Sequence, residues 1–450
     1  MAKWQFFFVI LCASAAICQT EMRQSIASAS AGGKSDTDQK IESSQQRVKT
    51  APGDYAGYDE LGSAFFQKAR ETGDISYYDL AEQTLKKSID LTPRDFRAAD
   101  PLVHIALVYM GEHRFKDALA SAREAIGLGS GNLPAFAIEG DAYTDMGDYG
   151  LAAEAYGTVQ TLGQATSSPL SLDYMSDSRI AYLRFLHGNS AEAIQMMQSA
   201  IAAGMQINVP RENLAWLYFE LGERYFQAGN MEGAELAYQS GMGADANHYR
   251  CIAGLAKVRA AQGKFDESIH LYARSIAIIP FPVYVEELGD VYRKVGKEKE
   301  AQQQYDLVEY VGHLGELNRV LANRELALFH ADHGVKLAEA VELARKELEV
   351  RHDIYTWDTL AWVLYKNGRS QEAAEDMNKA LALHTNDPLL LFHAAMIYHA
   401  LEKDSEAEEF LTRVLNTNPH FHLFHADEAR RMLEDIEARK QDSRTTNAKR

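Results

Sequence analysis

Residues 136–156 have the sequence FAIEGDAYTDMGDYGLAAEAY, and this stretch decides the fold of the chain. Phe136, Gly140 and Tyr143 are spaced by four and three residues, which places them on one stripe of a helix. Gly147 then allows the left-handed backbone conformation that ends a helix, and a second helix with the same period follows. Neither short helix can bury its stripe alone. The sequence therefore predicts a helix-turn-helix unit that stacks on copies of itself.

Copies of this unit recur along the chain, each marked by a turn glycine. Successive turn glycines are separated by 41, 41, 34, 33, 38 and 34 residues, at Gly147, Gly188, Gly229, Gly263, Gly296, Gly334 and Gly368. With a helix-turn-helix period near 34 residues, the chain resembles the tetratricopeptide repeat (TPR) family over nearly all of residues 54–437. The resemblance implies an all-α fold, a right-handed α-α superhelix of about ten repeats with a C-terminal cap helix. We also expect extra loops at 163–171 and 204–210, inside the two long intervals.

The N-terminus is predicted to direct export. The basic residue Lys3, an apolar run over 4–11 and the small residues at 13–15 follow the order of a secretory signal peptide, which we place at residues 1–18. The apolar run is too short to span a bilayer, so no membrane span is expected after signal cleavage. An uncleaved anchor and a lipid attached to Cys18 are the alternatives. The mature chain is expected in the periplasm or outside the cell, as in exported bacterial TPR arrays.

The segments that flank the repeats are predicted to lack structure. Residues 19–53 are rich in Ser, Gln, Gly and Lys and hold almost no large apolar residue. Such a segment cannot bury enough surface to offset the entropy that ordering costs, which predicts a disordered linker. A short disordered tail is expected at 438–450. The solenoid therefore occupies residues 54–437.

Charge and motifs exclude several classes of function. The chain has 46 Lys and Arg against 64 Asp and Glu, a net charge of −18, which argues against a nucleic-acid binder because neutralising phosphates requires clustered Lys and Arg. Motifs of nucleophilic or zinc-dependent hydrolases are missing from the sequence, so we expect neither an enzyme nor a cofactor. Histidine pairs and triplets can ligate zinc or nickel if their ring nitrogens converge, which leaves a metal-handling function as an alternative. The histidines concerned are His330 and His333, and His420, His422 and His425.

The resemblance implies that the concave wall of the superhelix comes from the first helix of each pair. Helical spacing selects the side of those helices that faces away from the packing stripe, and the residues there are mainly acidic and aromatic. Such a wall suits a basic or amphipathic protein segment. The predicted partner-binding residues are Asp141, Asp145, Arg179, Tyr182, Phe185, Phe219, Glu223, Phe226, Glu286, Asp290, Trp362 and Tyr365. Glu220, Glu287, His393, Met396 and His399 fall on the same helix faces.

These observations together predict a non-enzymatic, exported scaffold that binds a protein or peptide in its concave groove. An accessory or recognition subunit of an envelope complex is the first alternative, and a histidine-based metal-handling protein is the second. The fold alone does not decide between them.

Overall fold

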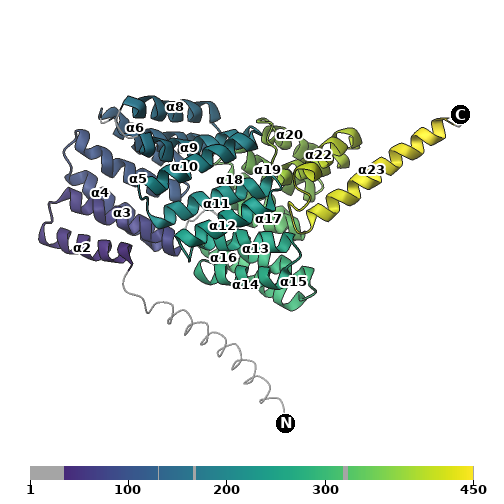
Figure 1. Cartoon of the computed structure of the whole chain (residues 1–450), viewed down its shortest axis with the longest axis horizontal. Coiled ribbons are helices and arrows are strands. Elements are labelled where there is room, and N and C mark those ends of the chain that lie inside the picture. The colour runs from purple at the N-terminus through teal and green to yellow at the C-terminus, as the bar shows by residue number, and fades with distance from the viewer. Residues whose placement is uncertain (1–34, 130, 166–168, 318–322, 449–450) are drawn as a thin grey trace, which may run out of the picture.

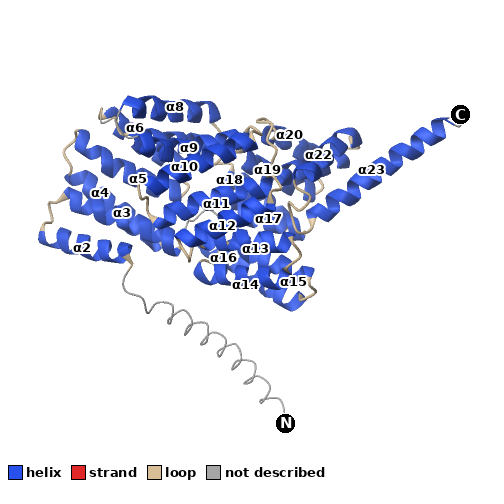
Figure 2. Cartoon of the chain, in the orientation of Figure 1, coloured by secondary structure: helices blue, strands red, loops and turns tan. Residues whose placement is uncertain are grey.

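The computed structural model describes residues 35–129, 131–165, 169–317 and 323–448. Within these ranges the chain is helical and contains no strand (Figures 1 and 2). None of the described helices is both long and apolar enough to cross a bilayer. The expected signal peptide at 1–18 lies outside the described residues.

Ten pairs of successive helices make up the array in the described residues, as the sequence predicted. The first five pairs are α3 (Tyr55–Thr72) with α4 (Ser76–Leu91), α5 (Ala99–Gly111) with α6 (Phe115–Gly127), α7 (Leu133–Asp145) with α8 (Tyr149–Ala165), α9 (Pro169–Leu186) with α10 (Ser190–Gln206), and α11 (Arg211–Gln227) with α12 (Met231–Ala244). The second five are α13 (Tyr249–Ala261) with α14 (Phe265–Ile278), α15 (Pro282–Lys294) with α16 (Glu298–Leu317), α17 (Asn323–His333) with α18 (Leu337–Glu347), α19 (Ile354–Lys366) with α20 (Ser370–Ala380), and α21 (Pro388–Ala400) with α22 (Asp404–Thr417). A one-turn 3-10 helix at Phe96–Ala98 precedes α5.

The turn inside each pair has the left-handed conformation that the sequence predicted. The seven turn glycines from Gly147 to Gly368 have φ angles between 66° and 80°. His113 and Glu402 take the same place in the second and tenth pairs, with φ angles of 57° and 59°. The array therefore keeps one turn geometry even where the glycine is replaced.

The two helices of a pair approach closely where a helical glycine faces a tyrosine. A Cβ added at Gly140 would lie 2.2 Å from the ring of Tyr156, and one at Gly222 would lie 2.4 Å from the ring of Tyr238. The tyrosine therefore fills the space that the missing side chain leaves. This contact explains the stripe of small residues that marks the repeats in the sequence.

Successive turns of the superhelix touch each other, which the sequence did not predict. The turns at the ends of α7, α9 and α11 lie against the loops that precede α19, α21 and α23. A Cβ added at Gly147 would lie 2.5 Å from the carbonyl oxygen of His352. One added at Gly188 would lie 2.7 Å from the carbonyl oxygen of His384, and one added at Gly229 would lie 2.2 Å from that of Thr417. Buried hydrogen bonds join the same segments, such as the one that Asn418 Nδ2 donates to the Phe226 carbonyl oxygen at 2.7 Å. The inner wall therefore surrounds a lumen instead of an open groove.

The N-terminal end of the array corrects the expected linker over residues 36–50, whereas residues 19–34 lie outside the described residues. Residues 36–50 form helix α2 (Asp36–Thr50), which lies beside α3 (Figure 1). The hydroxyl of Ser35 caps it by accepting a hydrogen bond from the Asp38 backbone at 3.1 Å, and Asp38 pairs with Lys68 at 2.6 Å. Ile41 packs on the core of the first pairs. A disordered segment was the wrong prediction here because a capped polar helix needs only a few apolar contacts to cover an array end.

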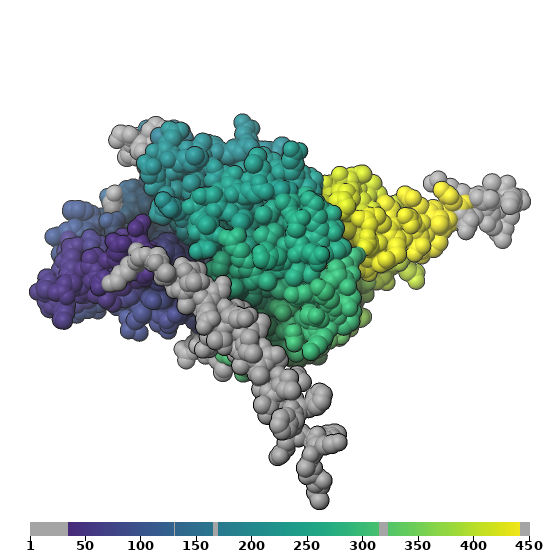
Figure 3. Space-filling view, turned by 60° about the horizontal axis from the view of Figure 1, so that its bottom comes forward, coloured from purple at the N-terminus to yellow at the C-terminus, as the bar shows by residue number. Residues whose placement is uncertain are grey.

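The C-terminal end has the predicted cap helix, but that helix is longer than expected. Helix α23 (His425–Ala448) packs on α22 and continues through residues 438–448, where a disordered tail was predicted. It projects away from the body of the molecule (Figures 1 and 3). The predicted loops at 163–171 and 204–210 are also shorter than expected, because α8 and α10 continue to Ala165 and Gln206.

Candidate functional site

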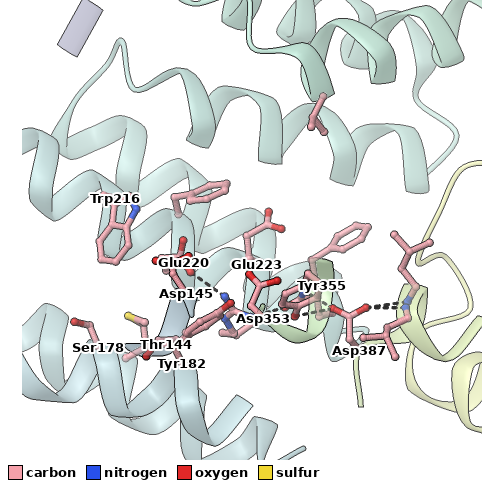
Figure 4. A pocket seen from close by; sticks show the side chains of 18 of the residues that line it. Thr144, Asp145, Ser178, Tyr182, Trp216, Glu220, Glu223, Asp353, Tyr355 and Asp387 are labelled. Atoms are coloured by element: carbon pink, nitrogen blue, oxygen red, sulfur yellow. Dashed lines mark hydrogen bonds and ion pairs between the residues drawn. The ribbon is translucent and has the colours of Figure 1, made fainter. Parts of the chain in front are cut away.

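The lumen contains a cavity of about 890 Å³ lined by the first helices of several pairs. Of the predicted partner-binding residues, Asp141, Asp145, Arg179, Tyr182, Phe219, Glu223 and Phe226 line it, as do Glu220 and Glu287. Figure 4 shows side chains from α11 (Trp216, Glu220, Glu223), from α9 (Tyr182) and from the C-terminal part (Asp353, Tyr355, Asp387) converging on this space. Its volume lies in the range of roughly 300–1,000 Å³ that is typical of ligand sites.

The inner carboxylates repeat one arrangement from pair to pair. Asp141 accepts a hydrogen bond from the Tyr156 hydroxyl at 2.9 Å and binds Arg179 of the next pair through both carboxylate oxygens. Glu223 accepts one from the Tyr238 hydroxyl at 2.6 Å and holds Lys257 of the next pair at 2.8 Å. These carboxylates therefore join a pair to its neighbour, and their charge is largely neutralised within the wall.

Asp290 shares the tyrosine bond of this arrangement, but its cation belongs to its own helix, α15. It accepts a hydrogen bond from the Tyr305 hydroxyl at 2.8 Å and lies 3.5 Å from Arg293. Instead of the central cavity, it lines a second cavity of about 340 Å³, between α13–α15 and residues 420–430.

Carboxylates nevertheless outnumber basic side chains around the central cavity, by nine to six. Glu287 forms no ion pair with a basic side chain among the described residues, and its side chain is hydrogen-bonded to Tyr272, while Lys257 is held by Glu223. Burial raises the pKa of Glu287 to about 7, and the carboxylates of Glu223 and Asp290 add to the shift, while Lys257 opposes it. Burial likewise raises the pKa of Asp145 to about 6. The wall therefore holds more carboxyl groups than basic side chains, and burial keeps Glu287 partly protonated near neutral pH.

Basic side chains of the cavity are held by aromatic rings as well as by carboxylates. Arg224 is 6% exposed, lies 4.1 Å from the ring centre of Phe185, and pairs with Glu220 at 2.9 Å. Arg351 lies 5.0 Å from the ring centre of Phe115 and 3.2 Å from Asp145. Because the cations are fixed in this way, they shape the wall more than they attract a ligand.

Several predicted residues do not reach the central cavity. Phe185 and Trp362 are each 1% exposed and belong to the hydrophobic core, since α9 and α19 are covered on more sides than helical spacing alone suggests. Tyr365 stacks on Trp362, with ring centres 5.1 Å apart, and lines neither described cavity. Glu286 lies 3.3 Å from the Nε2 atom of His333 instead.

The remaining candidates of the C-terminal pairs are also structural. His393 and Met396 are buried, and the His393 ring lies 3.0 Å from Asp358. His399 lies 2.7 Å from Asp404, at the turn of its own pair. These contacts occupy the far end of the predicted wall, where Tyr365 and His399 remain only partly exposed.

The sequence reasoning missed the residues that the closing loops bring to the cavity. Asp353 and Asp387 cap α19 and α21 by accepting hydrogen bonds from backbone N–H groups, and both line the cavity. An aspartate just before a helix identifies a cap in the sequence. Its place in the lumen follows only from the contact between turns of the superhelix.

The histidines suggested as metal ligands are dispersed over different contacts. Within the described part of the chain, no group of three or more His, Cys, Asp or Glu side chains is arranged to hold a metal ion. His330 lies 3.0 Å from Glu309, whereas His425 lies 3.4 Å from Asp332 and 3.3 Å from Glu428. His422 and His425 stack with ring centres 4.2 Å apart. His330 links α17 to α16, and His425 links α23 to α17.

Comparison with known proteins finds a family match for one part of the chain. Residues 359–420 match the family model described as tetratricopeptide repeat. No curated protein matches the sequence significantly. The solved structures that resemble the chain include the APC/C hetero-tetramer Cut9–Hcn1 (12% identity, 97% of both chains, TM-score 0.32), a tetratricopeptide repeat protein from Parabacteroides merdae (15% identity, 59% of this chain and 99% of that chain, TM-score 0.34) and yeast Tom70 (12% identity, 95% of this chain and 96% of that chain, TM-score 0.42). Residues 359–420 are therefore similar to tetratricopeptide repeats, and the ten helix pairs of the described residues share one turn geometry.

Proposed function

We propose that this chain is a non-catalytic scaffold that takes a basic, aromatic-containing segment of a partner protein into the central cavity. The observation that carries the proposal is the excess of carboxylates around an aromatic lumen, with Glu287 lacking a basic partner among the described residues. A Lys or Arg side chain of a ligand would supply the missing positive charge. Trp216, 36% exposed and at the cavity edge, offers a ring for stacking or cation–π contact.

The limited volume of the cavity favours a short or extended segment over a folded domain. The cavity volume is suited to a few side chains, and contacts between superhelical turns cover the flank of the lumen. An unfolded segment of the partner can adapt to such a space, at the entropic cost of its ordering.

The test uses two short fluorescein-labelled peptides, one alternating Lys and Phe and the other with each Lys replaced by Glu. We expect the Lys peptide to bind and the Glu peptide not to bind in fluorescence anisotropy. Glu287→Gln should weaken binding of the Lys peptide about tenfold, a change of about 1.4 kcal/mol. Glu300→Gln, on the exposed side of the same pair, is the matched control and should have no effect. Preferential binding of the Glu peptide would overturn the proposal.

The pH dependence of the same assay gives a second readout. Because the pKa of Glu287 is raised to about 7, its carboxylate gains charge as the pH rises through neutrality. Binding of the Lys peptide should therefore strengthen between pH 6 and 8 in the wild type. The strengthening should be smaller in Glu287→Gln, and an identical profile in both proteins would exclude Glu287 as the contact.

Export to the periplasm or the outside of the cell is part of the proposal and is supported by the order of charges and small residues in 1–18. N-terminal sequencing of the protein from its native host tests it. We expect the mature chain to begin between residues 16 and 20. A cytoplasmic protein that retains Met1 would contradict this localisation.

A further inference from the structure

Two stacked histidines mark the entry to the cap helix α23. His422 lies in the loop between α22 and α23, and His425 is the first residue of α23. Their ring centres are 4.2 Å apart and their ring planes differ by 21°. Two protonated imidazoles at this distance would repel each other. The stacked pair is therefore stable only while no more than one of its rings is charged.

The hydrogen bonds of His422 require a neutral ring. Its Nδ1 atom accepts hydrogen bonds from the backbone N–H groups of Phe424 at 3.3 Å and His425 at 3.2 Å. The ring thus caps the entry to α23, as an Asn or Asp side chain does at other helices. A protonated imidazole carries hydrogen on both nitrogens and cannot accept. Burial lowers the pKa of His422, and the charge of His425 lowers it further.

The contacts of His425 require a charged ring. The residue is only 7% exposed, and its ring nitrogens lie 3.4 Å from Asp332 of α17 and 3.3 Å from Glu428 of α23. Burial opposes the charge on the ring, but the contacts with these two carboxylates raise the pKa of His425 to about 9. Asp332 is fixed in turn by the hydrogen bond that Trp362 Nε1 donates at 2.7 Å. Loss of the His425 proton would remove the cation that faces both carboxylates.

The other ionisable groups around the pair increase the difference between the two rings. They are Glu223 on α11, Lys257 on α13, Glu286, Glu287, Asp290 and Arg293 on α15, His333 on α17, Asp358, Tyr365 and Lys366 on α19, His393 on α21, and Arg431 on α23. Arg293 and His393 lower the pKa of His422 further, although Asp332 opposes them. Asp290 interacts favourably with the charge on His425.

The pair lies where the chain completes the wall of the lumen. His422 lines both the central and the second cavity. Phe421 and Ala426 belong to the main hydrophobic core, and the ring of His425 stacks on Phe392 of α21 with ring centres 4.7 Å apart. The apolar contacts hold this segment in place, and the charges of the two rings add to those contacts or oppose them.

We propose that His422 and His425 form a proton-dependent latch, which fixes the entry of α23 to α17 and α21 and loosens when either ring changes its charge. A proton added to His422 in acid removes the cap of α23 and places two cations side by side. A proton lost from His425 in alkali leaves Asp332 and Glu428 without their cation. The latch is therefore tightest near neutral pH, and the lumen wall at this end opens more often on either side. This inference does not depend on what the lumen binds.

Hydrogen exchange of the full chain at pH 5, 7 and 9 tests the latch. The contribution of His422, with its lowered pKa, is lost as the pH falls below the ordinary value of about 6.5. The contribution of His425, with its raised pKa, is complete below that value and is lost as the pH rises through about 9.

After correction for intrinsic exchange rates, residues 425–431 should open about fivefold more often at pH 5 than at pH 7, and about thirtyfold more often at pH 9. The reference is the first turn of α7, where the Asn132 amide accepts a hydrogen bond from the Ala135 backbone at 3.2 Å. That turn should show neither change. Protection of 425–431 that is constant from pH 5 to 9 would overturn the proposal.

Two substitutions separate the acid response from the alkaline response. His422→Asn keeps an acceptor for the cap at every pH, so it should abolish the increase in opening at pH 5 and leave the increase at pH 9. His425→Gln removes the charge, so it should open more often than wild type at pH 7 and lose the further increase at pH 9. An acid response that persists in His422→Asn would exclude His422 as its source and overturn the latch.

A titration of the wild type keeps the proposal testable if a variant fails to fold. In NMR spectra of protein labelled at histidine Cε1, one ring should stay neutral to below pH 5 and another should titrate at about pH 9. Titration of every histidine between pH 6 and 7 would contradict the latch.

Discussion

The contact between superhelical turns predicts different effects for two glycine-to-alanine substitutions in the same type of turn. Gly229 and Gly368 have nearly identical φ angles of 77° and 76°, so an added Cβ imposes a similar backbone strain of about 1 kcal/mol at each. At Gly368 the Cβ would meet no atom within 4 Å, whereas at Gly229 it would lie 2.2 Å from the Thr417 carbonyl oxygen. Moving that loop adds an overpacking cost of about 1–3 kcal/mol. It also strains the buried bond from Asn418 to Phe226.

We therefore expect Gly229→Ala to lower the free energy of unfolding by about 2–4 kcal/mol and Gly368→Ala by about 1 kcal/mol. Urea denaturation followed by circular dichroism measures both values. Because repeat arrays can open locally without unfolding, hydrogen exchange at 417–418 should be measured as well, and it should accelerate only in Gly229→Ala. Equal destabilisation by the two variants, with unchanged exchange at 417–418, would refute the contact between turns.

Three further substitutions test the packing, the turns and the charge of the lumen. Ala152→Leu places a large side chain at a fully buried helix crossing and should cost about 1–3 kcal/mol in urea denaturation; a neutral result would contradict the assigned packing. Glu402→Gly removes the backbone strain of a non-glycine residue in the left-handed region, at a φ of 59°. It should stabilise the tenth pair by about 0.5–1 kcal/mol in the same assay, and destabilisation would count against that geometry. Burial raises the folded-state pKa of Glu287 from 4.5 to about 7, so ionisation of this group costs stability as pH rises. Glu287→Gln should therefore stabilise the chain by about 1 kcal/mol near pH 5 and by up to about 3 kcal/mol near pH 8. A gain independent of pH would refute the pKa shift.

Local features of the fold could be predicted from the sequence because they depend on neighbouring residues. The turn glycines from Gly147 to Gly368 have the expected left-handed backbone, and Gly140 makes the expected close approach to its partner helix. Both features follow from helical spacing within one repeat. The sequence did not reveal α2, because its stabilising contacts are a serine cap and a few apolar residues on α3.

The closure of the superhelix could not be predicted because it depends on small rotations that accumulate over several pairs. The cap residues Asp353 and Asp387 reach the cavity only through that closure. The charge of the wall was likewise overestimated, since Asp141 and Glu223 are neutralised by Arg179 and Lys257 of the next pair. Spacing within one helix identifies which side chains face inward, but it does not show which of them pair.

The most direct test of the central proposal is hydrogen exchange of the full chain with and without a saturating concentration of the Lys–Phe peptide. A ligand inside the lumen should slow exchange in the first helices of the pairs that line the cavity, above all α9, α11 and α15, and leave their outer partners α10, α12 and α16 unchanged. Protection confined to the outer helices, or no protection at saturation, would contradict the assignment of the lumen as the binding site.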